Sequence, residues 1–438
     1  MKKLHLTWLL LFVTTFLLAQ TKPGHIINAR EVERIERVLA SDEMRGRRIY
    51  SPEIDQAADF IAAELKAAGL ETCPPEWNKQ AGNNSGTYRQ EFTVISARFT
   101  GLTCKFNETE FDARNVVVVT AQPQINVTEK SGYEKTTIAA GKNLFAEAQR
   151  LLQSGKNHLV LVDTSYRKNF NRLSFLKRGM FKMDNSLVFV LTENGFPSTF
   201  SVEATHEITE QKLANVVAVL PGKSKKNEYV IFSGHYDHIG VGKPVNGDSI
   251  FNGANDDAAG TTAVIMLAKY YKALNNNERT LIFAAFTAEE SGGYGAQYFS
   301  RQFDPAQVVA MFNIEMIGTE SKWGKNSAYI TGYEQTDMGA IMQKNLEGTG
   351  FVFHPDPYTD QNLFYRSDNA TLARLGVPAH TISTSKMDSE PNYHKVSDEV
   401  ETLDLDNMTM IIQSIALSAR SIVSGKDTPT RVKVNELK

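Results

Sequence analysis

The fold is decided by the stretch Thr280-Leu-Ile-Phe-Ala-Ala-Phe-Thr-Ala-Glu-Glu-Ser-Gly-Gly-Tyr294. An apolar run from Leu281 to Phe286 is followed by the paired carboxylates of Glu289 and Glu290, and then by two glycines. This pattern predicts a buried strand that leads into a loop. An exposed acidic loop is the alternative. A functional site is favoured because buried charges need a partner, and because hydrolytic metal sites combine ligand carboxylates with one that acts as a base.

Apolar runs that end near acidic residues or histidines also occur on both sides of this stretch. The predicted strands are 215–220, 229–232, 281–286, 308–314 and 377–382, and the predicted helices are 258–274 and 405–423. Continuous apolar strands that alternate with helices indicate a mostly parallel α/β sheet covered on both faces. In such sheets ligands bind where strands end and loops begin. The acidic residues and histidines of this chain cluster at those positions.

The first half of the chain follows other patterns. Residues 29–70 show helical periodicity in two segments. Between about residues 92 and 208, short β-like runs are separated by charged, irregular segments. We interpret this region as an inserted α+β subdomain. The alternative is that its strands extend the main sheet.

Composition narrows the class of protein. The chain has 438 residues, of which 42% are hydrophobic and 22% are charged, as is ordinary for a globular protein. A net charge of -3 without a basic tail predicts no nucleic-acid partner. The two cysteines, Cys73 and Cys104, cannot supply a four-thiolate zinc site, so metal ligands are expected among histidines and carboxylates. Whether the two thiols pair is left open.

The N-terminus has the pattern of a secretion signal. Lys2 and Lys3 precede an apolar stretch from Leu6 to Leu18, and Ala19 is a plausible last residue before cleavage. A membrane anchor is the alternative, but the stretch is short for a span of ~20 residues. We therefore expect cleavage, export to the periplasm or the extracellular space, and no stable membrane anchor in the mature chain.

Two clusters upstream of the paired glutamates carry candidate ligands. His235 follows the predicted strand 229–232, and Asp237 can orient its imidazole by accepting a hydrogen bond. His238 is a weaker candidate, because alternation along the strand would point it the other way. Asp256 and Asp257 precede the predicted helix 258–274. One Asp is enough to cap a helix, so the pair predicts a turn that directs a carboxylate into a pocket, with Asp256 as the candidate bridge between two metals.

The paired glutamates and Glu315 supply further carboxylates. Of Glu289 and Glu290, one can bind metal while the other accepts a proton from water. Glu315 follows the predicted strand 308–314 among apolar residues, where a carboxylate needs a cation. An ion pair with a buried Arg or Lys is the alternative.

The C-terminal part adds His394 and Arg366. His394 lies in a loop before the last predicted helix, where alone it would be an ordinary loop residue. Arg366 begins Arg-Ser-Asp368, which is either a structural loop or part of a substrate-binding site. The charge of two Zn²⁺ would be balanced by a hydroxide and by the carboxylates of Asp256, Glu290 and Glu315.

Together, and in their order along the chain, these motifs resemble those of peptidase family M28. The motifs are Gly234-His-Tyr-Asp237, Gly253-Ala-Asn-Asp-Asp-Ala-Ala-Gly260, Ala288-Glu-Glu-Ser-Gly292, Asn313-Ile-Glu-Met-Ile-Gly318, Arg366-Ser-Asp368 and Tyr393-His394. The resemblance is strong over about residues 210–425 and weak over 30–70.

The resemblance implies a twisted, mostly parallel α/β sheet of the zinc-dependent exopeptidase type, with two zinc ions. It implies that one ion is held by His235, Asp256 and Glu315. It implies that the other is held by Asp256, Glu290 and His394, with Glu289 as general base. The family often has Asp where this chain has Glu315, and the longer side chain predicts a looser site beside His235. Tyr393 is the candidate donor to a developing oxyanion, and Asp257 and Arg366 are candidates for support of the site or contact with substrate.

These interpretations give a domain division and a functional hypothesis. The expected units are a signal peptide (1–19), an N-terminal part of the peptidase domain (20–96), an inserted protease-associated-like subdomain (97–210) and the main zinc peptidase domain (211–438). The leading hypothesis is an exported zinc aminopeptidase that acts on peptides with a metal-activated water. A carboxypeptidase or a glutaminyl cyclase on the same fold is an alternative. An inactive metal-binding protein is another, which the presence of Glu289 disfavours. Side-chain preference and oligomeric state are left open.

Overall fold

The computed structural model describes residues 22–78 and 86–434. The predicted signal peptide, residues 1–19, lies outside the described residues. Within the described ranges, no helix has both the length and the apolar character needed to cross a membrane.

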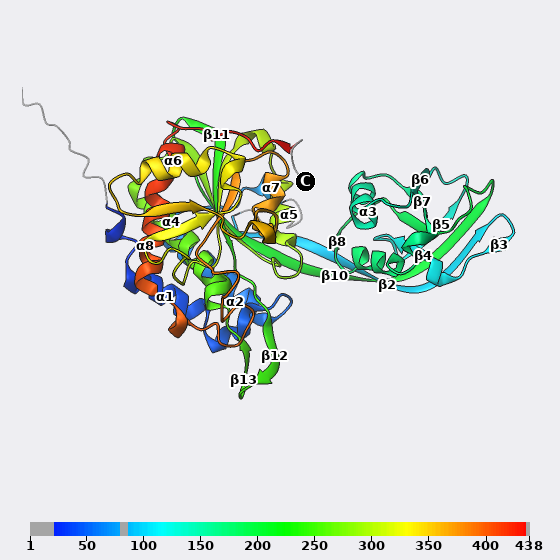
Figure 1. The fold of residues 1–438 in the computed structure, drawn as a ribbon, viewed down its shortest axis with the longest axis horizontal. Helices are drawn as coiled ribbons and strands as arrows, with labels where there is room; N and C mark the ends of the chain where they lie inside the picture. Colours follow the sequence, from blue (N-terminus) through cyan, green and yellow to red (C-terminus); the bar gives the residue numbers. More distant parts are fainter. Residues whose placement is uncertain (1–21, 79–85, 435–438) are drawn as a thin grey trace, which may run out of the picture.

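A large twisted sheet forms the centre of the molecule, with strand order β17-β16-β18-β15-β11-β14-β10-β2-β3 (Figure 1). The strands along this path are β2 (Arg89–Phe106), β3 (Thr109–Glu110), β10 (Phe200–Leu220), β11 (Lys225–His235), β14 (Arg279–Phe286), β15 (Val308–Ile314), β16 (Ser327–Ile330), β17 (Val352–Pro355) and β18 (Ala379–Ser383). Off the path, β1 (Glu71–Thr72) and β5 (Gln124–Thr128) pair with β10, and β8 (Met180–Phe181) pairs with β2. The four central strands β14, β11, β15 and β18 pair in parallel, whereas β10 and β16 join them antiparallel. The predicted α/β class is therefore confirmed, with antiparallel strands on either side of the parallel centre.

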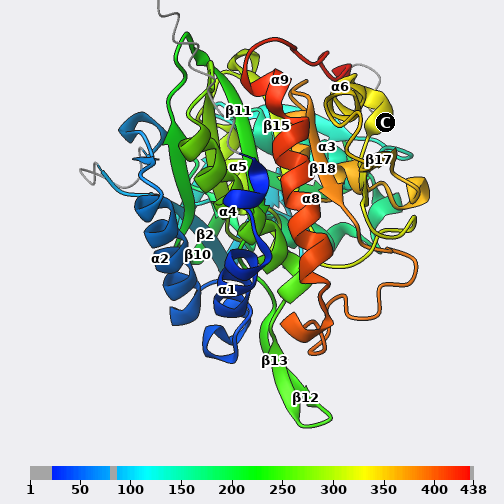
Figure 2. The ribbon, with the colours of Figure 1, turned by 90° about the vertical axis from the view of Figure 1, so that its left-hand side faces the viewer.

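Helices cover both faces of this sheet, because successive residues of the central strands are apolar on both sides. Phe232 and Phe283 pack into one core, whereas Ile231 and Ile282 pack into another on the opposite face. The first core is covered by α1 (Ala29–Leu39), α2 (Pro52–Ala67), α4 (Ala259–Leu274), α6 (Met338–Asn345) and α8 (Leu405–Ser418) (Figure 2). The second is covered by α5 (Tyr294–Ser300) and α7 (Ala370–Ala373). The predicted helix 405–423 is divided into α8 and α9 (Arg420–Val423).

Two long strands carry a second body away from the main sheet (Figure 1). β2 and β10 pair antiparallel from Arg89 opposite Val216 to Phe106 opposite Phe200. Both strands run without interruption through the expected borders at residues 97 and 210, so no linker marks those borders. The division into domains stays a prediction.

The outer body has its own sheet and its own cores. The sheet contains β4 (Val116–Val119), β9 (Leu187–Leu191), β7 (His158–Val162) and β6 (Glu134–Ile138), in that order, and α3 (Leu144–Gln153) packs beside it. Apolar residues of these strands enter two separate clusters, one of which includes Cys104. Cys73 lies in the second core of the main sheet, and both thiols are free.

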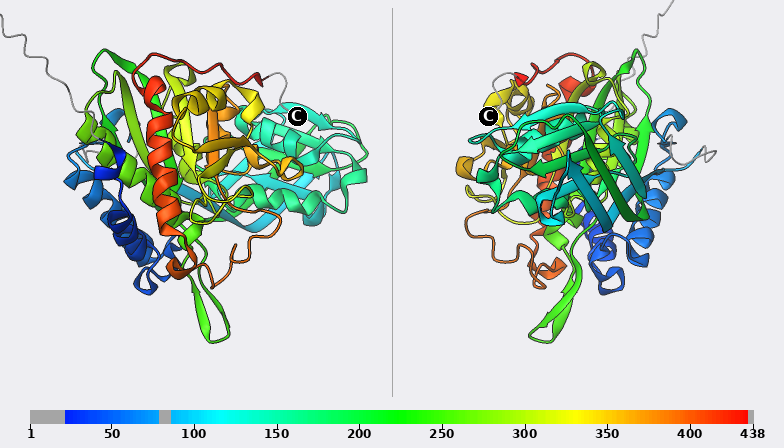
Figure 3. Two further views of the ribbon diagram at one scale, coloured as in Figure 1. Left: turned by 60° about the vertical axis from the view of Figure 1, so that its left-hand side comes forward. Right: turned by 90° about the vertical axis from the view of Figure 1, so that its right-hand side faces the viewer.

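A hairpin of β12 (Gly240–Val245) and β13 (Asp248–Phe251) projects from the main body (Figure 3). It follows His238 and precedes a turn at Ala254–Ala258, which leads directly into α4. The chain therefore leaves the sheet after β11, makes this excursion, and returns to the same edge of the sheet.

Candidate metal centre

The predicted ligand residues meet at the carboxyl end of the parallel strands. His235 is the last residue of β11, Glu315 directly follows β15, and the paired glutamates follow β14. Asp256 lies in the turn before α4, and His394 lies in the loop between β18 and α8. One pocket is lined by Asp256, Glu289, Glu290, Glu315 and His394 together.

Asp256 lies between two imidazoles. Its Oδ1 is 3.3 Å from His235 Nε2, and its Oδ2 is 3.3 Å from His394 Nε2. His394 Nε2 is also 3.2 Å from Glu290 Oε1. Each oxygen of one carboxylate thus faces a different group of donors, as a residue that bridges two metal ions must.

The donor atoms fit a zinc centre. Four of them are buried without a hydrogen-bond partner: His235 Nε2, Asp256 Oδ2, Glu290 Oε1 and Glu315 Oε2. Buried polar atoms normally have partners, so these orphaned atoms at the carboxyl end of the strands require an explanation. Imidazole nitrogens and carboxylate oxygens are zinc ligands, and bound cations would satisfy them.

Electrostatics divide the carboxylates of the pocket into two kinds. Burial opposes ionisation of Glu290, but the imidazoles of His238 and His394 outweigh it and lower its pKa to about 2. Hydrogen bonds to Asp256 and Glu290 raise the pKa of His394 to about 10. For Glu289 and Glu315, burial and neighbouring carboxylates raise the pKa above its usual value. Without a cation, that side of the pocket is short of positive charge.

No ionic partner offsets Glu315 in the described part of the protein. An ion pair with a buried Arg or Lys was the alternative for this residue, but among residues 22–78 and 86–434 no Arg or Lys pairs with it. Burial raises the pKa of Glu315 more than the charge of His235 and a hydrogen bond with Ser367 lower it. This arrangement favours the metal-ligand interpretation of Glu315.

Asp237 orients His235 through its backbone carbonyl and not, as expected from the sequence, through its side chain. The ring nitrogen His235 Nδ1 lies 3.0 Å from the backbone oxygen of Asp237 and 3.9 Å from its carboxylate. The backbone carbonyl is therefore the acceptor that leaves Nε2 free to face Asp256. The Asp237 carboxylate instead accepts from the backbone N–H of Glu289 at 3.0 Å and fixes the start of that loop.

The Asp257 carboxylate accepts hydrogen bonds from backbone N–H groups and does not line the pocket. Its carboxylate accepts from the backbone N–H groups of His235 at 3.1 Å, Gly260 at 2.9 Å and Met316 at 3.1 Å. It therefore ties the end of β11, the start of α4 and the residue after Glu315 together. These three hydrogen bonds favour support of the site over contact with substrate, and the role of Asp257 stays a prediction.

Two buried residues that fix the site, Asp398 and Arg47, were not predicted from the sequence. Asp398 accepts from the backbone N–H groups of Asn255 at 2.8 Å and Asp256 at 3.0 Å. The guanidinium of Arg47 donates to the backbone oxygens of Tyr236, Leu39, Asn252 and Gly253 at 2.6–2.9 Å. Both residues fix the turn that carries Asp256. Their distance along the chain hides this role, although Arg47 lies in a polar connection between two predicted helices.

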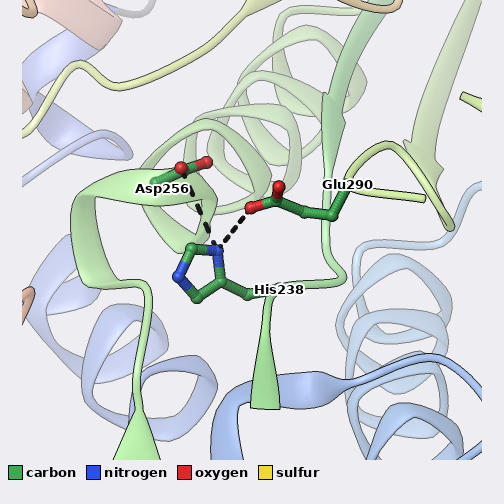
Figure 4. A group of neighbouring side chains, drawn as sticks. All are labelled: His238, Asp256 and Glu290. Atoms are coloured by element: carbon green, nitrogen blue, oxygen red, sulfur yellow. Dashed lines mark ion pairs between the residues drawn. The ribbon is translucent and has the colours of Figure 1, made fainter. Parts of the chain in front are cut away.

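The expectation that His238 points away from the site is wrong. Its Nδ1 lies 2.8 Å from Glu290 Oε1 and 4.0 Å from Asp256 Oδ2 (Figure 4). Alternation of side chains holds only within a strand, and β11 ends at His235. Beyond that residue the backbone turns, and the second histidine returns to the site.

Tyr393 and Arg366 both line the pocket. The Tyr393 ring stacks on His394, with centroids 4.0 Å apart, and burial raises the pKa of its hydroxyl, which therefore keeps its proton. Arg366 is exposed, at the rim. Asp368, which follows it, is buried, and burial raises its pKa to about 8.

Comparison with known proteins finds a family model and relatives that are similar to part of the main body. Residues 215–419 match the model of Peptidase family M28. A probable leucine aminopeptidase of Trichophyton verrucosum is 31% identical over 204 residues, which are 44% of this chain and 53% of that protein. A probable zinc metalloprotease of Pyrenophora teres f. teres is 34% identical over 240 residues, 51% of each chain. The matched stretch therefore spans about half the length of these relatives.

Solved structures share the fold. The aminopeptidase from Aneurinibacillus sp. strain AM-1 superposes with a TM-score of 0.53 at 17% identity, covering 95% of this chain and 98% of that one. A zinc aminopeptidase from Bacillus subtilis gives a TM-score of 0.53 at 15% identity, covering 94% and 96%. The resemblance to peptidase family M28 is confirmed for residues 215–419 by the match to the family model.

Proposed function

We propose that the protein is a zinc-dependent aminopeptidase that removes N-terminal residues from peptides. The observation that carries this proposal is the pair of donor groups around Asp256, with His235 on one side and Glu290 and His394 on the other. Glu315 completes the first group, and two zinc ions are the proposed cofactors. The match to peptidase family M28 supports the same assignment.

The residues have distinct proposed roles. Zinc bound between these donors supplies a Lewis acid that polarises the scissile carbonyl and acidifies water. Glu289 lies in the pocket without a role as ligand, and it accepts the proton of the attacking water and passes it to the leaving amine. Tyr393 keeps its proton and donates a hydrogen bond to the developing oxyanion.

The charges of the pocket favour recognition of an amine. Glu289 lines the pocket and is not among the carboxylates that would balance the charge of two zinc ions, so it is the group that can pair with the protonated α-amine of a peptide, whose reference pKa is ~7.7–8.0. A carboxypeptidase is the second candidate, since Arg366 also lines the pocket and can pair with a terminal carboxylate. Its exposed position at the rim makes it a weaker anchor than the buried acids, because solvent screens exposed pairs.

Blocked peptides test this choice. We expect the protein to cleave an unblocked dipeptide amide and to leave its N-acetyl form intact at equal concentration. Cleavage is followed by mass spectrometry, which identifies the end that shortens. Equal rates for the two forms would remove the aminopeptidase assignment. Faster cleavage of an N-blocked peptide with a free C-terminus would assign a carboxypeptidase.

We also propose that the protein is exported after removal of residues 1–19. The basic start, the apolar stretch and Ala19 support this proposal. N-terminal sequencing of the protein recovered from the producing cells tests it, because a mature chain that begins at Gln20 is expected and retained Met1 contradicts cleavage.

A further inference from the structure

His238 is fixed at the metal centre from several directions. Its side chain is fully buried, and its backbone N–H donates to the backbone oxygen of Arg47 at 3.3 Å. A Cβ placed on Gly253 would lie 2.5 Å from the His238 ring, so the ring fills the space that this glycine leaves. Arg47 in turn holds the carbonyl of Gly253 at 2.9 Å. The ring is therefore part of a rigid structure and does not swing freely.

Both ring nitrogens of His238 lack a hydrogen-bond partner in the described structure. Nδ1 is 2.8 Å from Glu290 Oε1, an atom that also lacks a hydrogen-bond partner. A cation bound by both atoms would satisfy them. Metal ligands approach one another in this way, because each directs its lone pair at the ion.

The distances suit one zinc ion. One atom each of His238, Asp256 and Glu290 lie within 4.8 Å of one another (Figure 4). With zinc–nitrogen and zinc–oxygen bonds of ~2.0–2.2 Å, neighbouring donors of a tetrahedral ion lie about 3.3–3.6 Å apart. The separations around Glu290 and Asp256, 2.8 and 4.0 Å from His238 and 3.2 and 3.3 Å from His394, are distributed about that value.

We propose that His238 is a ligand, through Nδ1, of the zinc ion held by Asp256, Glu290 and His394. This inference rests on the proposed zinc centre and deepens it. Four protein donors would then surround the ion on the Glu290 side, whereas His235, Asp256 and Glu315 supply three on the other.

Zinc titration of two variants tests the proposal. In His238→Asn, the tighter of the two zinc-binding events should weaken at least ~10-fold, whereas the weaker event persists. His206→Asn is the matched control, because His206 is also buried with both ring nitrogens unpartnered. It lies away from the proposed zinc site, on β10, where it faces Phe99 and Lys177. Its zinc binding should equal that of the wild type. Unchanged zinc affinity in His238→Asn would overturn the inference.

A second measurement on the wild-type protein needs no variant. With Co²⁺ in place of zinc, the NMR spectrum shows shifted ring N–H signals from ligand imidazoles, and three such residues are expected: His235, His238 and His394. Two would mean that His238 only orients Glu290, and would overturn its role as a ligand. If the wild-type protein binds no divalent metal at all, the proposed function fails first. If the protein binds two zinc ions and cleaves peptides but only two imidazoles are ligands, this inference fails and the proposed function stands.

Discussion

The two sides of the proposed metal centre share Asp256 and differ in burial and in the elements that carry their residues. The His235 side is built at strand ends and is buried, with 2% of the His235 side chain exposed. The Glu290 side is partly open, with 14% of the Glu290 side chain and 37% of the His394 side chain exposed. His394 comes from a loop, at a backbone φ of 55°. One half is thus determined by the sheet and the other by the loops that meet above it.

The difference teaches how charge is arranged before metal binds. On the Glu290 side, imidazoles already compensate the carboxylates and keep the pKa of Glu290 at about 2. On the His235 side, burial and like charges raise the pKa of Glu315. Both halves must therefore release a proton when metal binds, His394 on the first and Glu315 on the second. We expect tighter metal binding on the Glu290 side, because the longer side chain of Glu315 predicts a looser site beside His235.

The largest effect is expected from Glu289→Gln. Glu289 is proposed as the general base and is a ligand on neither side of the proposed metal centre. The variant should keep its metal and lose turnover by ~10²–10⁴-fold, because a general base is removed while the ligands remain. Zinc content by elemental analysis and peptide cleavage are measured on the same sample. Glu290→Gln is the contrasting variant and should lose metal together with activity. Loss of metal from Glu289→Gln would make Glu289 a ligand.

A smaller loss is expected from Tyr393→Phe, on the loop side. Removal of one donor to the developing oxyanion should lower kcat by roughly 10²-fold, with little change in KM. Tyr365→Phe is the control, since Tyr365 lies beside Arg366 but does not line the pocket. A change confined to KM would show that Tyr393 binds substrate and does not act on the reaction.

The smallest effect concerns the stability of the metal-free protein. The folded protein holds a proton on His394 up to about pH 10, whereas an unfolded histidine releases it near 6.5. The raised pKa stabilises the fold fully below about pH 6.5, and this contribution is lost as the pH rises towards 10. In the presence of a chelator, the free energy of unfolding of the wild type should therefore fall more steeply above pH 7 than that of His394→Asn. The difference is modest because solvent screens a partly exposed pair. Urea unfolding at several pH values measures it, and equal slopes would contradict the account.

Sequence reasoning succeeded where the chain is regular. The apolar runs that became β14 and β15 end beside the residues that the structure brings to the pocket, because a buried strand leaves a readable pattern in the sequence. It also recognised that Asp256 lies in a turn before a helix. These local signals were enough for the fold class and for the candidate ligands.

Where the backbone departs from regular structure, the sequence does not predict where a side chain lies or which distant residues it contacts. The side of the chain on which His238 lies depends on a turn after β11, and the role of Asp398 depends on a contact with residues about 140 positions earlier. The length of β10 was also missed. Residues from Phe200 to Glu207 alternate between buried and less buried positions, and residues 208–212 are half-buried or exposed. This largely polar pattern conceals a strand that continues into the apolar run 215–220.

Titration of the metal-free protein with zinc tests the central claim, which is that two unequal metal sites share Asp256. Calorimetry should show two equivalents per chain, a tighter event on the Glu290 side and a weaker one on the His235 side, where Glu315 and burial oppose charge. His235→Asn should remove the weaker event and leave the tighter one. A single equivalent at saturation, or two events that cannot be distinguished, would contradict the account.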